Sequence, residues 1–266
     1  MYLINCHSHS LYSGHGEGSV LDQAKSAFES GIQTFCFTEH LPLPHSMDPQ
    51  RKVSIAPELV ETYLSNIESA QEFYPEMDCV KGFEADYYEG CEKNIAPYKQ
   101  KVSLLLGSVH FLGTWNYDNS AYIKTWDNKD VDQVYYEYFE TWLKCAHSNI
   151  GFDVLSHPDL IKKFGHKPSF NLSAFYQKIV SQLKDTSVRY EISTAGLRAP
   201  VKEFYPSFEL GKELYKAGIP CVISTDSHRP QDVDYKLAEA YEYAKSLGYT
   251  SIEVPLKTGG FRTVQI

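Results

Sequence analysis

Short apolar segments and longer amphipathic segments alternate from one end of the chain to the other. The short segments are rich in β-branched and aromatic residues, a pattern typical of buried strands. They predict strands at Tyr2–Cys6, Thr34–Thr38, Cys79–Ala85, Leu104–His110, Phe152–Ser156, Val188–Ser193 and Cys221–Ser224, with a further short strand at Ser251–Val254. The longer segments repeat their apolar positions at helical spacing. They predict helices at Val20–Ser30, Pro57–Phe73, Val131–His147, Leu172–Leu183, Ser207–Ala217 and Asp232–Leu247.

This alternation predicts seven or eight βα units. Gly31, Gly218 and Gly248 directly follow three of the predicted helices, where glycine supplies the left-handed conformation that ends a helix. No linker or change in composition interrupts the units, and no Gly-x-Gly-x-x-Gly motif follows a strand. The pattern therefore favours one (β/α) barrel over an open, doubly wound sheet.

Composition excludes several classes of protein. The 266 residues are 42% hydrophobic and 14% aromatic, which is enough for a large core and argues against disorder. The apolar runs are too short to span a membrane, and no secretory leader is visible, so we expect a cytoplasmic protein. The six cysteines are widely spaced without a Cys-x-x-Cys pair, which predicts reduced, mostly buried thiols rather than disulfides.

The net charge of −9 argues against nucleic acid as a partner. No run of lysine or arginine is present, so the sequence lacks the basic surface expected of a nucleic-acid-binding protein. A small cationic or zwitterionic substrate suits this balance better. The sequence makes no prediction about the oligomeric state.

Histidines gather where the predicted strands end. Seven of the ten lie at or just after the carboxyl end of a strand: His7, His9, His15, His40, His110, His157 and His228. Two carboxylates, Glu84 and Asp226, occupy equivalent positions. In a barrel these ends meet on one face, so residues far apart in sequence become neighbours.

Such a set of side chains is typical of a multinuclear metal site. In the His-x-His pair, strand alternation places His7 and His9 on one face, where two imidazoles can bind one cation. Carboxylates can bridge two ions while imidazoles fill the other positions. We therefore expect divalent ions compatible with both ligand types, such as Zn, Mn or Fe.

The same residues, taken in order, resemble a known family. His7-Ser-His9, His15, Thr-Glu-His40, Glu84, Ser-Val-His110, Ser-His157-Pro and Thr-Asp226-Ser-His228 resemble the polymerase and histidinol phosphatase (PHP) family across nearly the whole chain. Tyr190-Glu-Ile-Ser-Thr-Ala-Gly-Leu-Arg198, followed by Tyr205-Pro206-Ser207, is similar to its stand-alone histidinol-phosphate phosphatase branch. The resemblance implies a distorted TIM-like barrel of about seven strands, one PHP-type domain over residues 1–266, and a metal site at the carboxyl ends of the strands.

The resemblance also implies a set of ligands for each of three divalent metals. The first metal would be held by His7, His9, Glu84 and Asp226, the second by Glu84, His110 and His157, and the third by His15, His40 and His228. All nine positions hold residues that can bind metal. Glu39 stands where members of this family often have aspartate. We expect it at most to contact a metal-binding residue, without binding metal itself.

The activity that the resemblance implies is hydrolysis of L-histidinol phosphate to L-histidinol and phosphate in histidine biosynthesis. Clustered metals would generate the hydroxide that attacks phosphorus and would neutralise the phosphoryl oxygens. Asp226 and His228 are both candidates to protonate the leaving alkoxide. Arg198 is the best candidate to bind phosphate, because a guanidinium matches two phosphate oxygens in one plane, and Arg229 is a second candidate for substrate contact.

Two long connections, 42–56 and 113–130, are also candidates for function, since long loops in a compact barrel are often functional. The second contains Trp115 and Tyr117, which could stack on an imidazole substrate or simply close the top of the barrel.

Three other functions remain in competition. An amidohydrolase is disfavoured, because His110 stands where such enzymes usually have lysine and His228 accompanies Asp226. A PHP-type phosphatase or nuclease acting on another phosphoester, such as a nucleotide or phosphotyrosine, would share the metal ligands. A metal-binding barrel without catalysis is weakened by the full ligand set.

Overall fold

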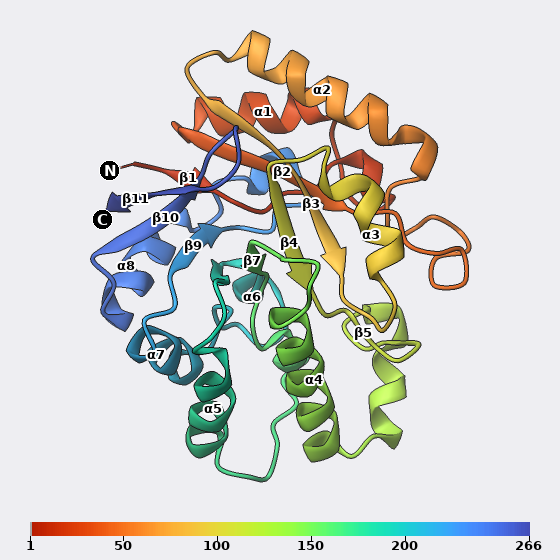
Figure 1. Cartoon of the computed structure of the whole chain (residues 1–266), viewed down its shortest axis with the longest axis vertical. Helices are drawn as coiled ribbons and strands as arrows, with labels where there is room; N and C mark the ends of the chain where they lie inside the picture. The colour runs from red at the N-terminus through yellow and green to blue at the C-terminus, as the bar shows by residue number, and fades with distance from the viewer. Residues whose placement is uncertain (1) are drawn as a thin grey trace.

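A barrel of seven parallel strands forms the centre of the computed structural model, which describes residues 2–266 (Figure 1). Around the barrel the strands are β1 (Ile4–Asn5), β2 (Thr34–His40), β3 (Asp78–Asp86), β4 (Leu104–Ser108), β7 (Val154–Leu155), β8 (Arg189–Ser193) and β9 (Cys221–Ser224). The first and last strands approach each other. The amide of Cys6 donates to the carbonyl of Ile223 at 3.0 Å, and Ser8 forms a parallel bridge with Ser227. The predicted distorted, seven-stranded barrel is confirmed.

Helices connect successive strands and surround the barrel (Figure 1). They are α1 (Val20–Glu29), α2 (Val60–Phe73), α3 (Glu92–Lys99), α4 (Val131–Ala146), α5 (Leu172–Val180), α6 (Ala195–Arg198), α7 (Phe208–Lys216) and α8 (Leu237–Leu247). Short 3-10 helices are η1 (Leu11–Ser13), η2 (Pro57–Leu59), η3 (Ser120–Asn128), η4 (Leu160–Lys162), η5 (Ser181–Leu183) and η6 (Pro230–Asp232). None of the helices in residues 2–266 has the length and hydropathy needed to cross a bilayer.

The six predicted helices are all present, with two displaced starts. The helix expected from Pro57 begins with the 3-10 helix η2, and α2 follows from Val60. The last was expected from Asp232, but α8 begins at Leu237, because η6 and a turn occupy the preceding residues. Helices α3 and α6 were not predicted. Both are short, and α3 contains Pro97, so neither gives a clear helical period.

Local chemistry explains where α1 begins. The hydroxyl of Ser19 accepts from the amide of Asp22, and the carboxylate of Asp22 accepts from the amide of Ser19 at 2.8 Å. This capping box satisfies backbone donors that the first turn leaves free. Val20, Ala24 and Ala27 then lie on one buried face against the barrel.

The packing of α4 on the barrel depends on a glycine in β4. A Cβ atom at Gly107 would lie 2.7 Å from the ring of Phe152 and 2.8 Å from Sγ of Cys145. Only a residue without a side chain allows α4 to approach so closely. The neighbouring Leu104, Leu105 and Leu106 are fully buried and fill the layers on either side of the strand.

Two hairpins lie outside the barrel. β10 (Ser251–Pro255) confirms the predicted strand at 251–254, but it pairs antiparallel with β11 (Phe261–Gln265) and does not join the barrel. This hairpin lies beside the amino terminus (Figure 1), where the guanidinium of Arg262 sits 4.4 Å from the ring centre of Tyr2. The second hairpin, β5 (Phe111–Leu112) with β6 (Trp115–Asn116), follows β4.

Candidate metal centre

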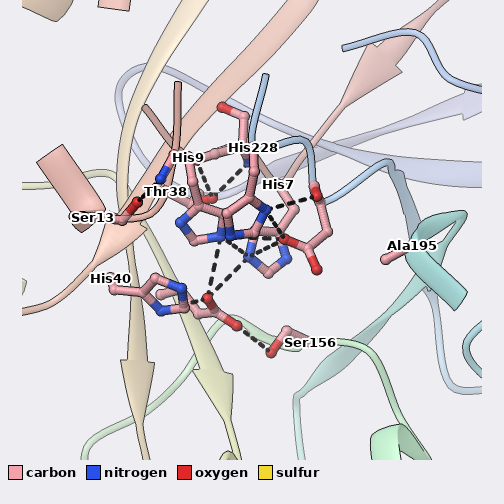
Figure 2. Close-up of polar contacts among 12 residues, drawn as sticks. His7, His9, Ser13, Thr38, His40, Ser156, Ala195 and His228 are labelled. Atoms are coloured by element: carbon pink, nitrogen blue, oxygen red, sulfur yellow. Dashed lines mark hydrogen bonds and ion pairs between the residues drawn. The ribbon is translucent and has the colours of Figure 1, made fainter. Parts of the chain in front are cut away.

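The carboxyl ends of the barrel strands bring the nine expected side chains together. His40 and Glu84 are register partners on β2 and β3, while His7 and His9 follow β1 and meet Asp226 and His228 from the end of β9. Figure 2 shows His7 and His9, which follow β1, converging with His40 at the end of β2 and His228 after β9. The imidazole rings of His9 and His228 stack with centroids 4.4 Å apart.

Glu84 lies at the centre of the cluster and is 1% exposed. Its Oε1 accepts from Ser108 Oγ at 2.6 Å and lies 2.8 Å from His157 Nε2. Its Oε2 lies 3.2 Å from His7 Nε2, 3.3 Å from His9 Nε2 and 3.0 Å from His40 Nδ1. Among residues 2–266, no side chain makes a hydrogen bond of normal geometry to Oε2. A buried carboxylate oxygen surrounded by imidazoles in this way fits a bridging metal ligand.

Three pairs of imidazole nitrogens face each other. The Nε2 atoms of His7 and His9 are 2.9 Å apart, those of His15 and His228 are 3.0 Å apart, and those of His110 and His157 are 3.3 Å apart. Two neutral rings cannot both direct lone pairs, or both direct protons, at such distances without repulsion. Ligands of one tetrahedral zinc ion, with Zn–N bonds near 2.05 Å, lie about 3.3 Å apart. Where both rings of a pair present a lone pair, a shared cation between the two Nε2 atoms would remove the repulsion.

The other ring nitrogen of several histidines is held by an acceptor. Nδ1 of His7 is 2.8 Å from Glu191 Oε1, Nδ1 of His110 is 2.9 Å from Asp86 Oδ1, and Nδ1 of His9 is 3.3 Å from Glu39 Oε1. His15 and His228 direct Nδ1 toward backbone carbonyls. A proton held on Nδ1 leaves the lone pair of Nε2 facing the cluster, as a metal ligand requires. His40 is turned the other way and presents Nδ1 to Glu84.

Donor atoms in four groups lie within 4.8 Å of one another. The groups are His7 with His9 and Asp226, His7 with Glu84 and His157, His40 with Glu84 and His110, and His9 with His40 and His228. These groups overlap the three sets implied by the family resemblance. They differ in two ways: His15 is in none of these groups, and His40 adjoins Glu84 and His110 as well as His228.

The charges within the cluster oppose one another. Burial would lower the pKa of His7, but the carboxylates of Glu191 and Glu84 outweigh it and raise that pKa well above its usual value. For His15, burial and the neighbouring His40 lower the pKa to about 4. Burial, together with the charge of His9, also lowers the pKa of His228 well below its usual value. Rings that stay neutral at pH 7 keep a lone pair for a metal.

Strained backbone lies next to the donors. His157 has a φ of 26° and Asp226 a φ of 50°, both in the left-handed region that residues other than glycine seldom adopt. Each follows the end of a strand and directs its side chain back over the barrel. Such strain is common where a side chain must be held at a functional site.

A cavity of about 540 Å³ opens above the cluster and is also lined by Arg198. Nη2 of Arg198 donates to the carbonyls of Thr225 at 2.6 Å and Asp226 at 2.7 Å, which fixes the guanidinium against the loop that carries Asp226. Among the residues described, its buried Nη1 has no hydrogen-bond partner. An unpaired guanidinium nitrogen beside a cavity can bind an anion such as phosphate.

The structure does not bring Trp115, Tyr117 or Arg229 to the cavity wall. Tyr117 is 1% exposed and donates to the carbonyl of Val109, and the indole of Trp115 donates to Thr125 Oγ1 at 2.7 Å. Both rings pack against Trp126, and neither is among the residues that line the cavity. Arg229 is paired with Glu17 at the surface, 3.2 Å from Nε to Oε1.

The remaining histidines lie outside the cluster, as expected. His166 stacks on Trp126 with centroids 4.2 Å apart, His147 caps the end of α4, and His45 is exposed in the 42–56 connection.

Sequence reasoning overlooked several residues that contact the site. Glu191 contacts His7, the amide of His157 and the hydroxyl of Ser224. The motif Tyr190–Arg198 contains Glu191, but this residue was assigned no role from the sequence. A buried charge inside an apolar strand was the available signal. Asp86 had a similar signal, since it lies two residues after Glu84 on the same face of β3. Asp118 and Lys163 line the cavity as an ion pair, and nothing in the sequence indicated that they meet.

A family model for the PHP domain matches residues 5–195 of this chain. The chain belongs to the PHP domain family. The matched segment covers β1 to the start of α6 and includes seven of the nine expected donor residues, all except Asp226 and His228.

Relatives of this PHP protein extend over nearly its whole length. A protein named "probable histidinol-phosphatase" from Deinococcus radiodurans is 31% identical over 253 residues, which are 92% of this chain and 94% of the relative. The histidinol-phosphatase of Bacillus subtilis is 25% identical, over 89% of this chain and 96% of that protein.

A solved structure shows the same fold. The histidinol phosphate phosphatase from Lactococcus lactis, in complex with zinc, L-histidinol and phosphate, superimposes with a TM-score of 0.80, covers 98% of each chain and is 18% identical. At that identity the likeness establishes the barrel. Together with the donor groups of this chain, membership of the family supports binding of divalent metal at the strand ends.

Proposed function

We propose that this PHP protein, acting as one barrel domain over residues 1–266, hydrolyses L-histidinol phosphate to L-histidinol and phosphate. The observation that carries the proposal is the shared cavity, which is lined both by members of the donor cluster and by Arg198, whose Nη1 has no hydrogen-bond partner among the described residues. Full-length similarity to proteins named histidinol-phosphatase supports the choice of substrate.

The metal cluster would comprise three divalent ions, of Zn, Mn or Fe, with the ligand sets given above. Glu84 would bridge two of them, since its two oxygens face different groups of imidazoles. When bound, such ions lower the pKa of a water toward neutrality and stabilise negative charge on a phosphoryl group.

Arg198 binds and orients the phosphate in this proposal. Its Nη2 is already committed to two carbonyls, so Nη1 is the nitrogen available for a phosphoryl oxygen. Because the guanidinium is held by neighbouring backbone, little conformational freedom is lost when phosphate binds.

Asp226 and His228 are assigned to the proton that the leaving alkoxide needs. Oδ1 of Asp226 lies 3.6 Å from Nδ1 of His228, and both residues line the cavity beside Arg198. Both side chains therefore lie beside the space that the departing oxygen would occupy.

A substrate panel with metal-depleted and reconstituted protein tests the proposal. We expect the highest kcat/KM for L-histidinol phosphate, compared with a nucleoside monophosphate, a phosphotyrosine peptide and p-nitrophenyl phosphate. Activity should disappear on chelation and return with a divalent metal. A preference for any other phosphoester would overturn the substrate, and full activity in protein shown to be metal-free would overturn the mechanism.

A further inference from the structure

One carboxylate on the cavity wall is not engaged by a histidine. Among residues 2–266, the carboxylates that line the cavity are Glu84, Asp86, Asp118 and Asp226. Glu84 and Asp226 contact imidazoles of the donor cluster, and Asp86 accepts from the ring of His110. Asp118 instead pairs through Oδ2 with the ammonium of Lys163, at 2.9 Å.

Asp118 is held in place by its neighbours in the chain. The hydroxyl of Tyr117 donates to Val109, and the carbonyl of Tyr117 accepts from the indole of Trp126 at 2.9 Å. On the other side, the side chain of Asn119 accepts from the amide of Ala121 and caps η3. The carboxylate is thus mounted on a well-anchored segment, with its side chain 15% exposed toward the cavity.

The surroundings keep Asp118 charged. Burial alone would raise the pKa of this carboxyl, but the charges of Lys163 and His110 outweigh burial and hold the pKa below its usual value. His157 acts in the same direction, so Asp118 lies near enough to the donor cluster to sense its charges. Only Oδ2 has a hydrogen-bond partner within the described chain, and Oδ1 is left for a ligand.

We propose that Asp118 binds the primary ammonium group of the substrate and so makes the enzyme selective for phosphate esters of amino alcohols. This inference rests on the proposed function. Phosphate would lie at the donor cluster and Arg198, and the carbon next to the ester would carry its amine within the same cavity, whose wall includes Asp118. There Oδ1 of Asp118 offers a charge-assisted hydrogen bond.

The ammonium is a better partner for Asp118 than the imidazole of the same substrate. An imidazole is mostly neutral above pH 7, whereas a primary amine of this kind remains protonated. Lys163 does not displace the amine from Asp118, because its ammonium binds Oδ2 and leaves Oδ1 free of protein partners in the part of the chain that the structure describes. Because Lys163 is also a cation, it repels a second cation near Asp118. Such a cation binds favourably only where it can make contact with Oδ1.

The experiment compares two substrates at pH 8 in metal-loaded enzyme. They are L-histidinol phosphate and imidazolylpropyl phosphate, the same ester without the amine, and the readout is the ratio of their kcat/KM values. Asp118→Asn should reduce this ratio at least tenfold, mainly through a higher KM for the amine-bearing substrate. Asp127→Asn, an equivalent change at an exposed position in η3, should leave the ratio within about twofold.

A third variant separates amine binding from the ion pair itself. Lys163→Gln removes the partner but keeps the carboxylate, so the ratio should persist even if both kcat/KM values change. An unchanged ratio in Asp118→Asn would overturn the inference while leaving the proposed function intact, as would an equal loss of ratio in Lys163→Gln. A wild-type enzyme that hydrolysed neither ester would overturn the proposed function, and the inference with it.

Discussion

Glu84 is a buried carboxylate that contacts several imidazoles at once. Its two oxygens face imidazoles from β1, β2, β7 and the segment after β4, so it connects donors from four parts of the barrel. Burial would raise the pKa of Glu84, but His7, His40 and His110 outweigh it and hold the pKa well below its usual value. The carboxylate is therefore ionised and available to metal at neutral pH.

Replacement of Glu84 should remove metal and activity together. Glu84→Gln keeps the shape of the side chain but loses the bridging charge, so we expect kcat to fall about a hundredfold or more and the metal content to drop. Elemental analysis and steady-state kinetics measure both. His166→Ala provides the control, since His166 only stacks on Trp126, and equal damage there would contradict the assigned site.

Arg198 and Arg229 offer a direct comparison between two arginines. Arg198→Ala should lower kcat/KM more than tenfold, about 1.4 kcal/mol or more, because a charge-assisted contact to phosphate is lost. Inhibition by inorganic phosphate should weaken in parallel. Arg229→Ala should change either value by less than about twofold, because that side chain pairs with Glu17 at the surface. The reverse order of effects would rule out Arg198 as the phosphate ligand.

Glu191 contacts two of the expected metal ligands, and we expect it to position them. Its carboxylate accepts from His7 and from the backbone amide of His157 at 2.5 Å. Glu191→Gln should weaken metal affinity about ten- to a hundredfold, as measured by competition with a fluorescent chelator. Glu253→Gln, in the hairpin beyond the barrel, should not. Unaltered affinity in a folded Glu191→Gln protein would show that the contact does not support the ligands.

At the scale of elements, periodicity predicted every barrel strand and the six longer helices. Strand ends are marked by a change from apolar residues to histidine, as at Phe37 to His40, and this made most of the site visible. The two aromatic residues Trp115 and Tyr117 were placed in the right connection, but their partners Trp126 and Tyr138 could not be inferred. Packing between loops depends on contacts distant in sequence, which a local pattern does not encode.

Hairpins and short helices were overlooked for a related reason. β11 has three exposed or half-exposed polar positions among its five residues, so its alternation is weak, and β5 and β6 have only two residues each. Their stability comes from pairing with a neighbouring strand and from packing on the barrel.

The capping box of α1 makes a testable contribution to stability. Ser19→Ala removes the hydroxyl that accepts from the amide of Asp22, and should lower the free energy of unfolding by about 1 kcal/mol. Urea denaturation of the metal-free protein measures the change. Ser69→Ala, within α2, removes only a hydroxyl that donates to a backbone carbonyl in its own helix and should be neutral or slightly stabilising. A Ser19→Ala protein as stable as wild type would mean that Asp22 alone is sufficient.

Across the whole molecule, the core protects all six thiols. All six cysteines are free and buried, which agrees with the expectation of mostly buried thiols rather than disulfides. Burial raises the pKa of Cys79 to about 12 and raises the pKa of Cys6 and Cys145 well above the ordinary value.

This burial predicts slow reaction with a thiol reagent. Because the thiolate is the reactive form, a raised pKa keeps these groups protonated and unreactive at pH 8. Ellman's reagent should modify none of the six cysteines of the native protein within minutes, and all six once guanidinium has unfolded the chain. Rapid modification of one thiol in the native state would reveal local opening of the barrel near it.

Because the barrel closes between β1 and β9, donors from the two strand ends are synthesised at very different times. His7 and His9 leave the ribosome more than two hundred residues before Asp226 and His228. A nascent chain that has not yet reached residue 226 therefore lacks two of the nine expected donors. The full donor set is assembled only once the end of β9 has been made, and a chain terminated before that point would carry many histidines without gaining phosphatase activity.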